Sequence, residues 1–419
     1  MNLAGLLFAS ALAIVQSGFV AGPNGAPQGW RTWSPREEIA PRFFVDHGAL
    51  TVSGNGHAGV YGGWEYPVSA IETGAWYRFV GHYRCTGVPH ESWQILPRID
   101  WRTSEGNRVG QIDFVYKTVR EGDWNKVTAE IQAPQNASRA ILQLYLFNAP
   151  QGVVWWNDIS FEQVPQPAPR PITVASLNLR PQSTESSAES VRQFIAAVDR
   201  VIPGKTDVIL LPEGITVIGT GRKYVDVAEP IPGPTTERLG ELAKKRSSYI
   251  AAGIYEREGA TIYNTAVLLD RHGELVGKYR KVYLPVAEID GGLTPGNEYP
   301  VFRTDFGTVG LMICYDVMYP EPAQALARQG AEILLLPIWG GDETLAKARA
   351  IENKVFLIAS GYDHPTYVMD PDGQRIASAP ANGTVAIATI DLSKRYLDRE
   401  LGEMRARRVK ESRVDVKVH

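Results

Sequence analysis

The sequence predicts two domains, an all-β sandwich followed by an α/β domain. The chain has 419 residues, which exceeds the length at which one hydrophobic core keeps growing. Up to about residue 164, apolar and polar residues alternate in short runs, whereas after residue 172 apolar strands alternate with amphipathic helical segments. Nine of the ten tryptophans lie in the first part. The change of pattern places the domain boundary between these two positions.

The first part has the pattern of strands without helices. Short runs with period-two alternation are separated by Gly, Pro and Asn, and they lie at 49–52, 76–83, 111–116, 125–131 and 140–147. We interpret residues 22–164 as a β-sandwich of the jelly-roll kind. The closing segment Val153-Val-Trp-Trp-Asn-Asp-Ile-Ser160 resembles the last strand of carbohydrate-binding-module-like, galactose-binding-like sandwiches. Carbohydrate is therefore a candidate partner, and the alternative is a lid or spacer whose tryptophans serve packing.

The second part has α/β patterning. Residues 165–171, rich in Pro and Gln, predict an extended linker, and residues 172–419 predict an α/β domain with a C-terminal tail. Helices are expected at 187–201, 236–246, 321–328 and 344–353. Strands are expected at 172–177, 207–211, 250–254, 264–269, 308–313, 333–336, 355–359, 367–369 and 385–390. Turn sequences at 270–273 and 371–373 join neighbouring strands, so the sheet is expected to be mixed.

The N-terminal residues predict export. Residues 3–15 are uncharged, and this run has the length of the apolar core of a secretory signal rather than of a membrane span. We therefore expect residues 1–21 to be a signal peptide and the protein to be periplasmic or extracellular. The alternative is an uncleaved N-terminal membrane anchor.

Charge and cysteine content exclude several classes of protein. The formal net charge is -3 and no run of lysine and arginine is longer than three residues, so we do not expect nucleic acid as a partner. Only two cysteines occur, Cys85 and Cys314, and they fall in different predicted domains, which argues against a disulfide framework. Zinc-ligand spacings are absent, so neither a metal nor a cofactor is expected.

Three short motifs in the second part each follow a predicted strand. They are Pro-Glu-Gly at 212–214, Tyr-Arg-Lys at 279–281 and Cys-Tyr-Asp-Val-Met-Tyr-Pro-Glu at 314–321. Ligands of open α/β sheets gather at the carboxyl ends of strands, where such residues can converge. Taken singly, each motif has an ordinary explanation as a helix cap, a solvated lysine or a buried free thiol.

In this order the motifs resemble the catalytic signatures of the nitrilase, or carbon–nitrogen hydrolase, superfamily. The resemblance extends over residues 172–408 and includes the segments 293–296, 334–337 and 349–353. It implies an αββα sandwich that assembles as dimers or larger homo-oligomers. The segment from Arg395 to Arg408 would be the tail that embraces the partner subunit.

The resemblance also implies catalytic roles for individual residues. Glu213 would be the general base and acid, Lys281 the oxyanion stabiliser and Cys314 the nucleophile. Glu288, seven positions after Lys281, falls where the family often has a second glutamate that orients the lysine and the substrate. A cysteine thiol has an ordinary pKa of about 8.5, so it needs a base and a nearby positive charge to attack at neutral pH. The expected activity is hydrolysis of a small amide or N-carbamoyl substrate through an acyl-thioester.

Two departures from the family pattern bear on the substrate. Tyr283 stands where the family frequently has His, and Val317 and Met318 stand where many carbamoyl-amino-acid hydrolases have basic residues. The second departure predicts a preference for neutral or cationic amides, unless another cation such as Arg349 reaches the substrate. The alternatives are a true nitrilase, although those usually have Cys-Trp-Glu in place of Cys-Tyr-Asp, and an inactive exported carbohydrate-binding protein.

Overall fold

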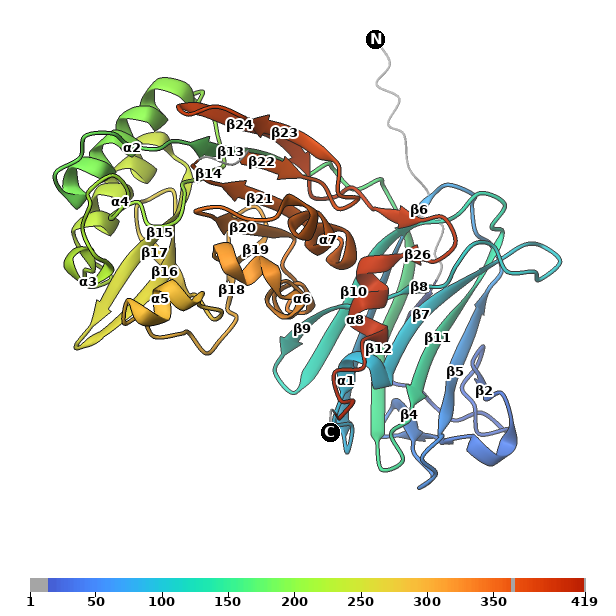
Figure 1. The fold of residues 1–419 in the computed structure, drawn as a ribbon. Coiled ribbons are helices and arrows are strands. Elements are labelled where there is room, and N and C mark those ends of the chain that lie inside the picture. The colour runs from blue at the N-terminus through green and yellow to red at the C-terminus, as the bar shows by residue number, and fades with distance from the viewer. Residues whose placement is uncertain (1–13, 363–365, 418–419) are drawn as a thin grey trace, which may run out of the picture. The chain divides into compact units, whose positions relative to one another are not determined.

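The computed structural model describes residues 14–362 and 366–417, so the N-terminal part of the predicted signal peptide lies outside the described residues (Figure 1). The chain forms two compact units. The first unit extends to Ala168 and also includes the chain from Leu397 onwards, and the second unit is Pro169–Tyr396. The chain therefore crosses from one unit to the other twice.

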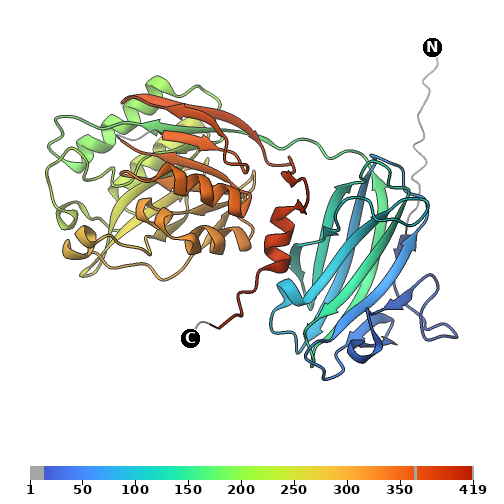
Figure 2. The same cartoon turned by 45° about the vertical axis from the view of Figure 1, so that its right-hand side comes forward.

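The first unit consists of two antiparallel sheets with a shared core (Figures 1 and 2). The larger sheet has the order β3-β4-β12-β6-β10-β9, with β1 also paired to β12, and the smaller sheet has the order β2-β5-β11-β7-β8. Because side chains alternate along a strand, Trp64, Trp101 and Trp156 all point into this core. The strands of the larger sheet are β1 (Ile14–Gln16), β3 (Arg42–Asp46), β4 (Ala49–Ser53), β6 (Trp76–Thr86), β9 (Lys117–Glu121), β10 (Trp124–Gln132) and β12 (Val153–Val164). Those of the smaller sheet are β2 (Arg31–Trp33), β5 (Tyr61–Val68), β7 (Ile95–Arg102), β8 (Asp113–Phe114) and β11 (Arg139–Phe147).

Short helices and the N-terminal strand complete this unit. The helices are η1 (Glu37–Ile39) and α1 (Glu91–Gln94). Strand β1 pairs with β12, with Ile14 opposite Phe161, and Phe19 is buried in the core. Cleavage after residue 21, the predicted boundary, would remove both β1 and Phe19. Residues 14–21 are part of the sandwich, whereas the sequence predicted that they belong to a signal peptide. Within the described parts of the chain, no helix is long and apolar enough to span a membrane.

The second unit has four layers in the order α, β, β, α. One six-stranded sheet has the order β17-β16-β15-β14-β13-β24, the other has the order β18-β19-β20-β21-β22-β23, and a core of apolar residues from both sheets lies between them. Helices α2 and α4 cover the outer face of the first sheet, and α6 and α7 cover that of the second. Strands such as β14 are buried on both faces, which explains their continuous apolar sequences.

Most predicted elements of this unit are confirmed. The first sheet and its helices are β13 (Pro171–Asn178), α2 (Ser187–Val201), β14 (Val208–Leu210), α3 (Tyr224–Val227), α4 (Pro234–Arg246), β15 (Tyr249–Glu258), β16 (Thr261–Leu269), β17 (Leu275–Arg280), α5 (Val286–Asp290) and β24 (Thr384–Asp391). The second sheet and its helices are β18 (Val301–Arg303), β19 (Thr308–Leu311), η2 (Cys314–Met318), α6 (Pro320–Arg328), β20 (Ile333–Pro337), α7 (Glu343–Asn353), β21 (Phe356–Ser360), β22 (Thr366–Met369) and β23 (Arg375–Ala379). Strand β17 follows the predicted turn at 270–273, although its bounds were not predicted. Its Arg280 is held by buried Glu256, at 2.6 Å between Nη2 and Oε1.

The C-terminal tail packs on the sandwich of its own chain. It comprises β25 (Leu397–Asp398), β26 (Gly402–Glu403) and α8 (Met404–Glu411). Ala406 lies in a buried cluster with Leu96, Phe114 and Tyr145, and the Lys410 Nζ donates to the carbonyl of Ile95 at 3.0 Å. The structure thus groups the chain from Leu397 onwards with the first unit, whereas the sequence placed residues 172–419 in one domain. Contact of the tail with a partner subunit stays a prediction.

Candidate active site

Glu213 lies just beyond the carboxyl end of β14. Its side chain is 2% exposed, and the Tyr362 hydroxyl donates a hydrogen bond to its backbone carbonyl. The neighbouring strand β15 approaches closely at Gly253, where a Cβ atom would lie only 2.6 Å from the Glu213 Cα. The backbone around Glu213 is therefore fixed by close packing against a glycine.

Lys281 follows the last residue of β17. Its backbone N–H donates to the Asn264 carbonyl on β16 at 2.9 Å, and its carbonyl accepts from the Gly296 N–H at 2.8 Å. A Cβ atom at Gly296 would lie 2.2 Å from the Arg280 carbonyl oxygen. This close approach gives a structural reason for the glycine in the 293–296 segment. The side chain of Lys281 is only 1% exposed.

Cys314 begins η2, just beyond the end of β19. Its φ of 42° lies in the left-handed region, which is strained for a residue with a side chain. Asp316 stabilises the turn, since its Oδ2 accepts from the Ile313 N–H at 2.9 Å and its Oδ1 accepts from the Tyr283 N–H at 3.0 Å. Burial raises the pKa of Asp316 to about 6. Asp316 therefore connects the turn at Cys314 to the segment that follows Lys281.

A network of hydrogen bonds brings three of the predicted residues together. The Lys281 Nζ donates to Glu213 Oε1 at 2.9 Å and to Glu288 Oε1 at 3.0 Å. Glu288 lies in α5 and is buried. The Nδ2 of Asn264 donates to the same two oxygens, at 2.7 and 2.8 Å. Asn264 lies in none of the predicted motifs. A polar residue within the apolar strand β16 was its one signal, and its partners follow only from the folded structure.

The electrostatics of the site keep the thiol protonated at rest. Burial and then the charge of Glu213 raise the pKa of Cys314 to about 12, against the opposing effect of Lys281. The Cys314 Sγ donates to the Gly340 carbonyl at 3.1 Å. Burial alone would lower the pKa of Lys281, but nearby negative charge, that of Glu213 first, outweighs it and raises that pKa. Burial raises the pKa of Glu288, with Lys281 opposing.

Three buried acceptors in this site have no partner within the described protein. They are the Glu213 Oε2, the Glu288 Oε2 and the Asn264 Oδ1. A buried acceptor without a partner costs about 1–3 kcal/mol, so these atoms are suited to a polar guest that donates hydrogen bonds. A thiol proton, a water molecule and an amide nitrogen all meet that requirement. In the described ranges no group of three or more His, Cys, Asp or Glu is arranged to hold a metal ion.

Arg349 is buried and supports the segment that follows the nucleophile. Its Nε donates to the Val317 carbonyl at 3.2 Å and its Nη2 to the Met318 carbonyl at 3.3 Å. The Nη1 pairs with Glu352 at 3.0 Å. Each nitrogen of the guanidinium thus has an acceptor in the protein, which gives Arg349 a structural role.

The fold and the site define a class of protein. A thiol, a carboxylate and an ammonium group lie at strand ends of an αββα unit, and such a set can supply a nucleophile, a base and an oxyanion stabiliser for acyl transfer from an amide. Residues 173–400 match the family model described as carbon-nitrogen hydrolase, and the chain belongs to this family. It is an enzyme of the amidase type, which acts on non-peptide carbon–nitrogen bonds.

Individual relatives match about half of the chain. Omega-amidase NIT2 of Bos taurus is 32% identical over 240 residues, which cover 51% of this chain and 87% of the relative. The human omega-amidase NIT2 is 31% identical over the same length, with the same coverage. Among solved structures, an amidase from Nesterenkonia sp. is 25% identical with a TM-score of 0.46, and the match covers 54% of this chain and 92% of that one.

Proposed function

We propose that the chain is a cysteine amidohydrolase that cleaves the carbon–nitrogen bond of a small amide or N-carbamoyl substrate through an acyl-thioester on Cys314. One observation carries the proposal. Glu213 is buried and held by Lys281 and Asn264 through Oε1 alone, which leaves Oε2 without a partner. A carboxylate fixed through one oxygen and free at the other is suited to proton transfer.

The first half-reaction forms the thioester. The Cys314 Sγ attacks the substrate carbonyl carbon while its proton passes to the Glu213 Oε2. Lys281 uses two of its three N–H groups on the glutamates, and the third stabilises the developing oxyanion. Glu213 then gives the proton to the leaving nitrogen, and the carbon–nitrogen bond breaks.

The second half-reaction hydrolyses the thioester. Water attacks the thioester carbonyl and loses its proton to Glu213, and the thiol of Cys314 is regenerated. Glu288 and Asn264 hold the lysine and the base in place through the shared hydrogen bonds. The raised pKa of Cys314 implies that the thiolate forms only as Glu213 accepts its proton.

The substrate is proposed to be uncharged near the reacting carbonyl. Val317 and Met318 supply no cation, and the nitrogens of Arg349 are all engaged by protein acceptors. A substrate carboxylate buried without a cation is costly. The relatives named omega-amidases support an amide rather than a nitrile as the substrate.

Ammonia release from matched substrates tests this proposal. We expect kcat/KM for neutral amides and carbamoyl amines to exceed that for N-carbamoyl amino acids by about tenfold, as expected for a lost charged contact near 1.5 kcal/mol. Amides should also react faster than nitriles. A preference for N-carbamoyl amino acids would contradict the uncharged site, and absence of turnover on every substrate would contradict the amidohydrolase.

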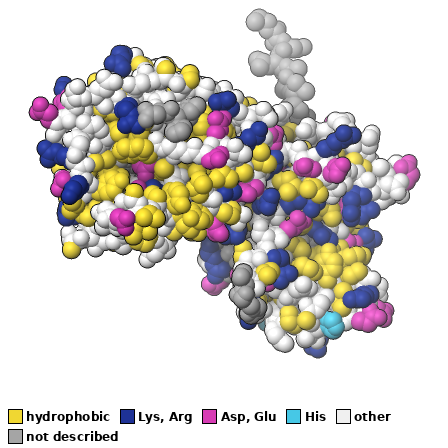
Figure 3. Space-filling model, in the orientation of Figure 1, with side chains coloured by type: hydrophobic (Ala, Val, Ile, Leu, Met, Phe, Trp, Pro, Cys, Tyr) yellow, Lys and Arg dark blue, Asp and Glu magenta, His cyan; other side chains and the backbone are white. Residues whose placement is uncertain are grey.

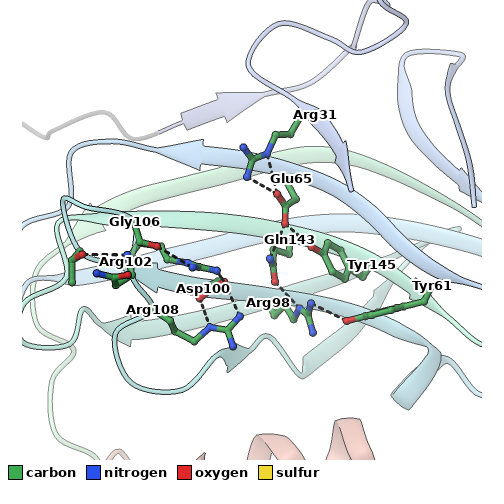
Figure 4. A network of polar contacts seen from close by, with 12 residues as sticks. Arg31, Tyr61, Glu65, Arg98, Asp100, Arg102, Gly106, Arg108, Gln143 and Tyr145 are labelled. Carbon is green, nitrogen blue, oxygen red and sulfur yellow. Dashed lines mark hydrogen bonds and ion pairs between the residues drawn. The ribbon is translucent and has the colours of Figure 1, made fainter. Parts of the chain in front are cut away.

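A second proposal, that the sandwich binds carbohydrate, is favoured by the outer face of its smaller sheet (Figure 4). Buried Glu65 accepts from Arg31 Nη2 at 2.7 Å and from Gln143 Nε2 at 2.8 Å. Next to this network, Trp33 is 36% exposed and stacks on Tyr145 with 5.1 Å between ring centroids. The network fixes the sheet face on which Tyr145 lies, and an exposed indole held by stacking on Tyr145 is suited to the apolar face of a sugar ring.

Retention on insoluble polysaccharides tests the carbohydrate proposal. Trp33→Ala should weaken retention, whereas Phe44→Ala should not, because Phe44 has a similar exposure of 41% but lies on the other sheet. Equal retention of both variants, or no retention of the wild type across a broad panel, would leave the sandwich as a spacer.

Export remains a proposal, which the uncharged N-terminal run supports. Since β1 and Phe19 belong to the sandwich, we place any processing before Ile14 rather than after residue 21. N-terminal sequencing of the mature protein would test this position. A mature chain that begins after residue 21 would contradict it.

A further inference from the structure

Four neighbouring strands of the smaller sheet carry a row of polar side chains on its outer face (Figure 4). Arg31 on β2 lies opposite Glu65 on β5. Glu65 in turn lies opposite Gln143 on β11, and Gln143 lies opposite Arg98 on β7. Side chains at paired positions of neighbouring strands point to the same face. The row therefore ends in an arginine on each side, with about 14 Å between the two Cα atoms over three strand spacings.

The two arginines differ in how their charge is compensated. Arg31 pairs with the Glu65 carboxylate at 2.7 Å. Arg98 donates from Nε to the Gln143 Oε1 at 2.7 Å and from Nη2 to the Tyr61 hydroxyl at 3.0 Å, and both acceptors are neutral. Within the described parts of the chain, Arg98 pairs with no carboxylate and its Nη1 has no acceptor. Arg98 is only half-buried, so an anion from solution can meet these N–H groups.

Further positive charge lies along the same strand. Asp100, two positions after Arg98, is buried and accepts from both Arg102 and Arg108, at 3.0 Å between the Arg108 Nε and Oδ1. One carboxylate thus serves two guanidinium groups, and the side chain of Arg108 is 49% exposed. In Figure 3, Lys and Arg side chains lie beside hydrophobic side chains over the area where Figure 1 draws β7, β8 and β11. This face is therefore positive, although the chain has a net charge of -3.

Aromatic side chains lie in direct contact with Arg98. Its Cζ lies over the Tyr145 ring, 4.3 Å from the centroid, and Trp33 stacks on the same ring at 5.1 Å, so Trp33 and the guanidinium carbon are at most about 9.4 Å apart. Tyr61 contacts both rings, at 5.7 Å from Trp33 and 5.6 Å from Tyr145. Gly63 leaves room for this packing, since a Cβ atom there would lie 2.6 Å from the Tyr145 ring. The exposed indole and the unpaired guanidinium thus belong to one continuous set of contacts.

We propose that this face binds an acidic saccharide, with the carboxylate of a uronate unit paired to Arg98 and the apolar face of a sugar ring stacked on Trp33. The inference rests on the proposed carbohydrate function of the sandwich and adds the class of sugar. A planar guanidinium matches the two oxygens of a carboxylate, and an indole matches the apolar face of a sugar ring. A saccharide is favoured over a nucleic acid because the positive charge is confined to a few arginines of a chain with negative net charge.

Calorimetry with galacturonate oligomers and with their neutral methyl esters tests the proposal, because the two ligands differ in charge and share the same sugar rings. The wild type should bind the acidic form about tenfold or more tightly than the ester, as expected for one charged hydrogen-bonded pair. This preference should shrink as the ionic strength rises. Mannuronate, guluronate and glucuronate oligomers are compared with their esters in the same way, since charge alone does not select the configuration of the ring.

Single substitutions separate the charge from the stacking. Arg98→Gln should weaken binding of the acidic form about tenfold or more and leave binding of the ester unchanged, whereas Trp33→Ala should weaken both. The matched control is Arg78→Gln, which also removes one arginine but lies on β6 of the larger sheet, where Arg78 pairs with Glu130 at 2.7 Å. The control should stay within about twofold of the wild type, since distant exposed charges are screened. Urea unfolding checks that each variant is folded, and Arg98→Lys, which keeps the charge but loses the planar fork, should bind with intermediate affinity.

The contrary outcomes separate this inference from the carbohydrate proposal. Equal affinity for the acidic and neutral forms of every saccharide, lost in Trp33→Ala, would overturn the inference and leave carbohydrate binding intact. If no saccharide of either form binds, both proposals fall. Single-stranded DNA or anionic lipid vesicles bound as tightly as the acidic oligomers, with equal losses in Arg98→Gln and Arg78→Gln, would overturn the inference in favour of a general attraction for anions.

Discussion

Both units contain a buried glutamate within a hydrogen-bonded network, and the two networks differ in how completely they are satisfied. Glu65 in the sandwich accepts from Arg31 through Oε2 and from Gln143 and Tyr145 through Oε1. Glu213 in the hydrolase unit accepts through Oε1 only, and its Oε2 has no partner among the described residues. Both carboxylates are buried, so burial alone does not distinguish the Glu65 site from the Glu213 site.

The difference indicates how a functional carboxylate is recognised. A buried acceptor that lacks a partner has a cost, which a protein retains only where a guest molecule or a proton will meet it. The network around Glu65 has no such vacancy, and it therefore stabilises the sheet face. The network around Glu213 holds the carboxylate in place and leaves one oxygen for chemistry.

Substitution of the two cysteines, one at a time, should give the largest difference in activity. Burial raises the pKa of Cys85 and of Cys314 to about 12 in each case, so neither is a thiolate at rest. Cys314 lies near Glu213 and Lys281, the proposed base and oxyanion stabiliser, whereas Cys85 lies near Glu91 and Arg120 in the other unit. We expect Cys314→Ala to lose essentially all ammonia release and Cys85→Ala to stay within about twofold of the wild type. Comparable turnover by Cys314→Ala and the wild type would refute the mechanism.

Removal of the ammonium group should have the next largest effect. Lys281→Ala should lower kcat by about 100- to 1,000-fold, because oxyanion stabilisation of about 2.7–4 kcal/mol is lost. Lys278→Ala on strand β17, which leads to Lys281, is the matched control, since Lys278 pairs with Glu256 rather than with the catalytic glutamates. Steady-state kinetics of both variants decide the question. An unchanged kcat for Lys281→Ala would exclude the oxyanion role.

The sequence predicted the hydrolase unit better than the sandwich, for physical reasons. Buried parallel strands and amphipathic helices have strong periodic patterns, so α2 was predicted with both boundaries correct. Strand β5 was missed because its Gly62, Gly63 and Pro67 weaken the strand pattern. The contacts of the tail could not be predicted, since those such as the contact of Lys410 with Ile95 join residues 315 positions apart.

Some residues of the candidate site could be predicted from sequence motifs, and others only from the folded structure. Glu213, Lys281 and Cys314 lie in motifs, and Glu288 has a fixed spacing from Lys281, so all four could be named from the sequence. Asn264 could not, because its hydrogen bonds to Glu213 and Glu288 depend on the pairing of distant strands. The cost of an unpaired acceptor is likewise visible only in three dimensions.

Removal of Glu65, whose two carboxylate oxygens both accept hydrogen bonds, should affect stability rather than activity. Glu65→Ala leaves the donors of Arg31, Gln143 and Tyr145 without their acceptor, and we expect it to lower the free energy of unfolding of the first unit by about 3–5 kcal/mol. Urea unfolding followed by tryptophan fluorescence reports on this unit, because nine of the ten tryptophans lie in it. The kcat of the folded variant should match that of the wild type, since each unit has its own core. A reduced kcat with unaltered stability would contradict this assignment.

The smallest predicted effect concerns the docked tail and its dependence on pH. Burial lowers the pKa of Lys410 to about 8, against an ordinary value of 10.5 in the unfolded chain. Between these two pH values the unfolded state binds more protons than the folded state. The first unit therefore becomes more stable as the pH rises from 8 towards 10.5. Below pH 8 this lysine contributes no pH dependence. The gain between pH 7.5 and 9.5 should be of order 1–2 kcal/mol. In Lys410→Met this part of the pH dependence should disappear, because a methionine of similar length keeps the packing but does not titrate. Urea unfolding of both proteins at the two pH values measures the difference, and equal pH dependence in the two would show that Lys410 is not buried in α8 as described.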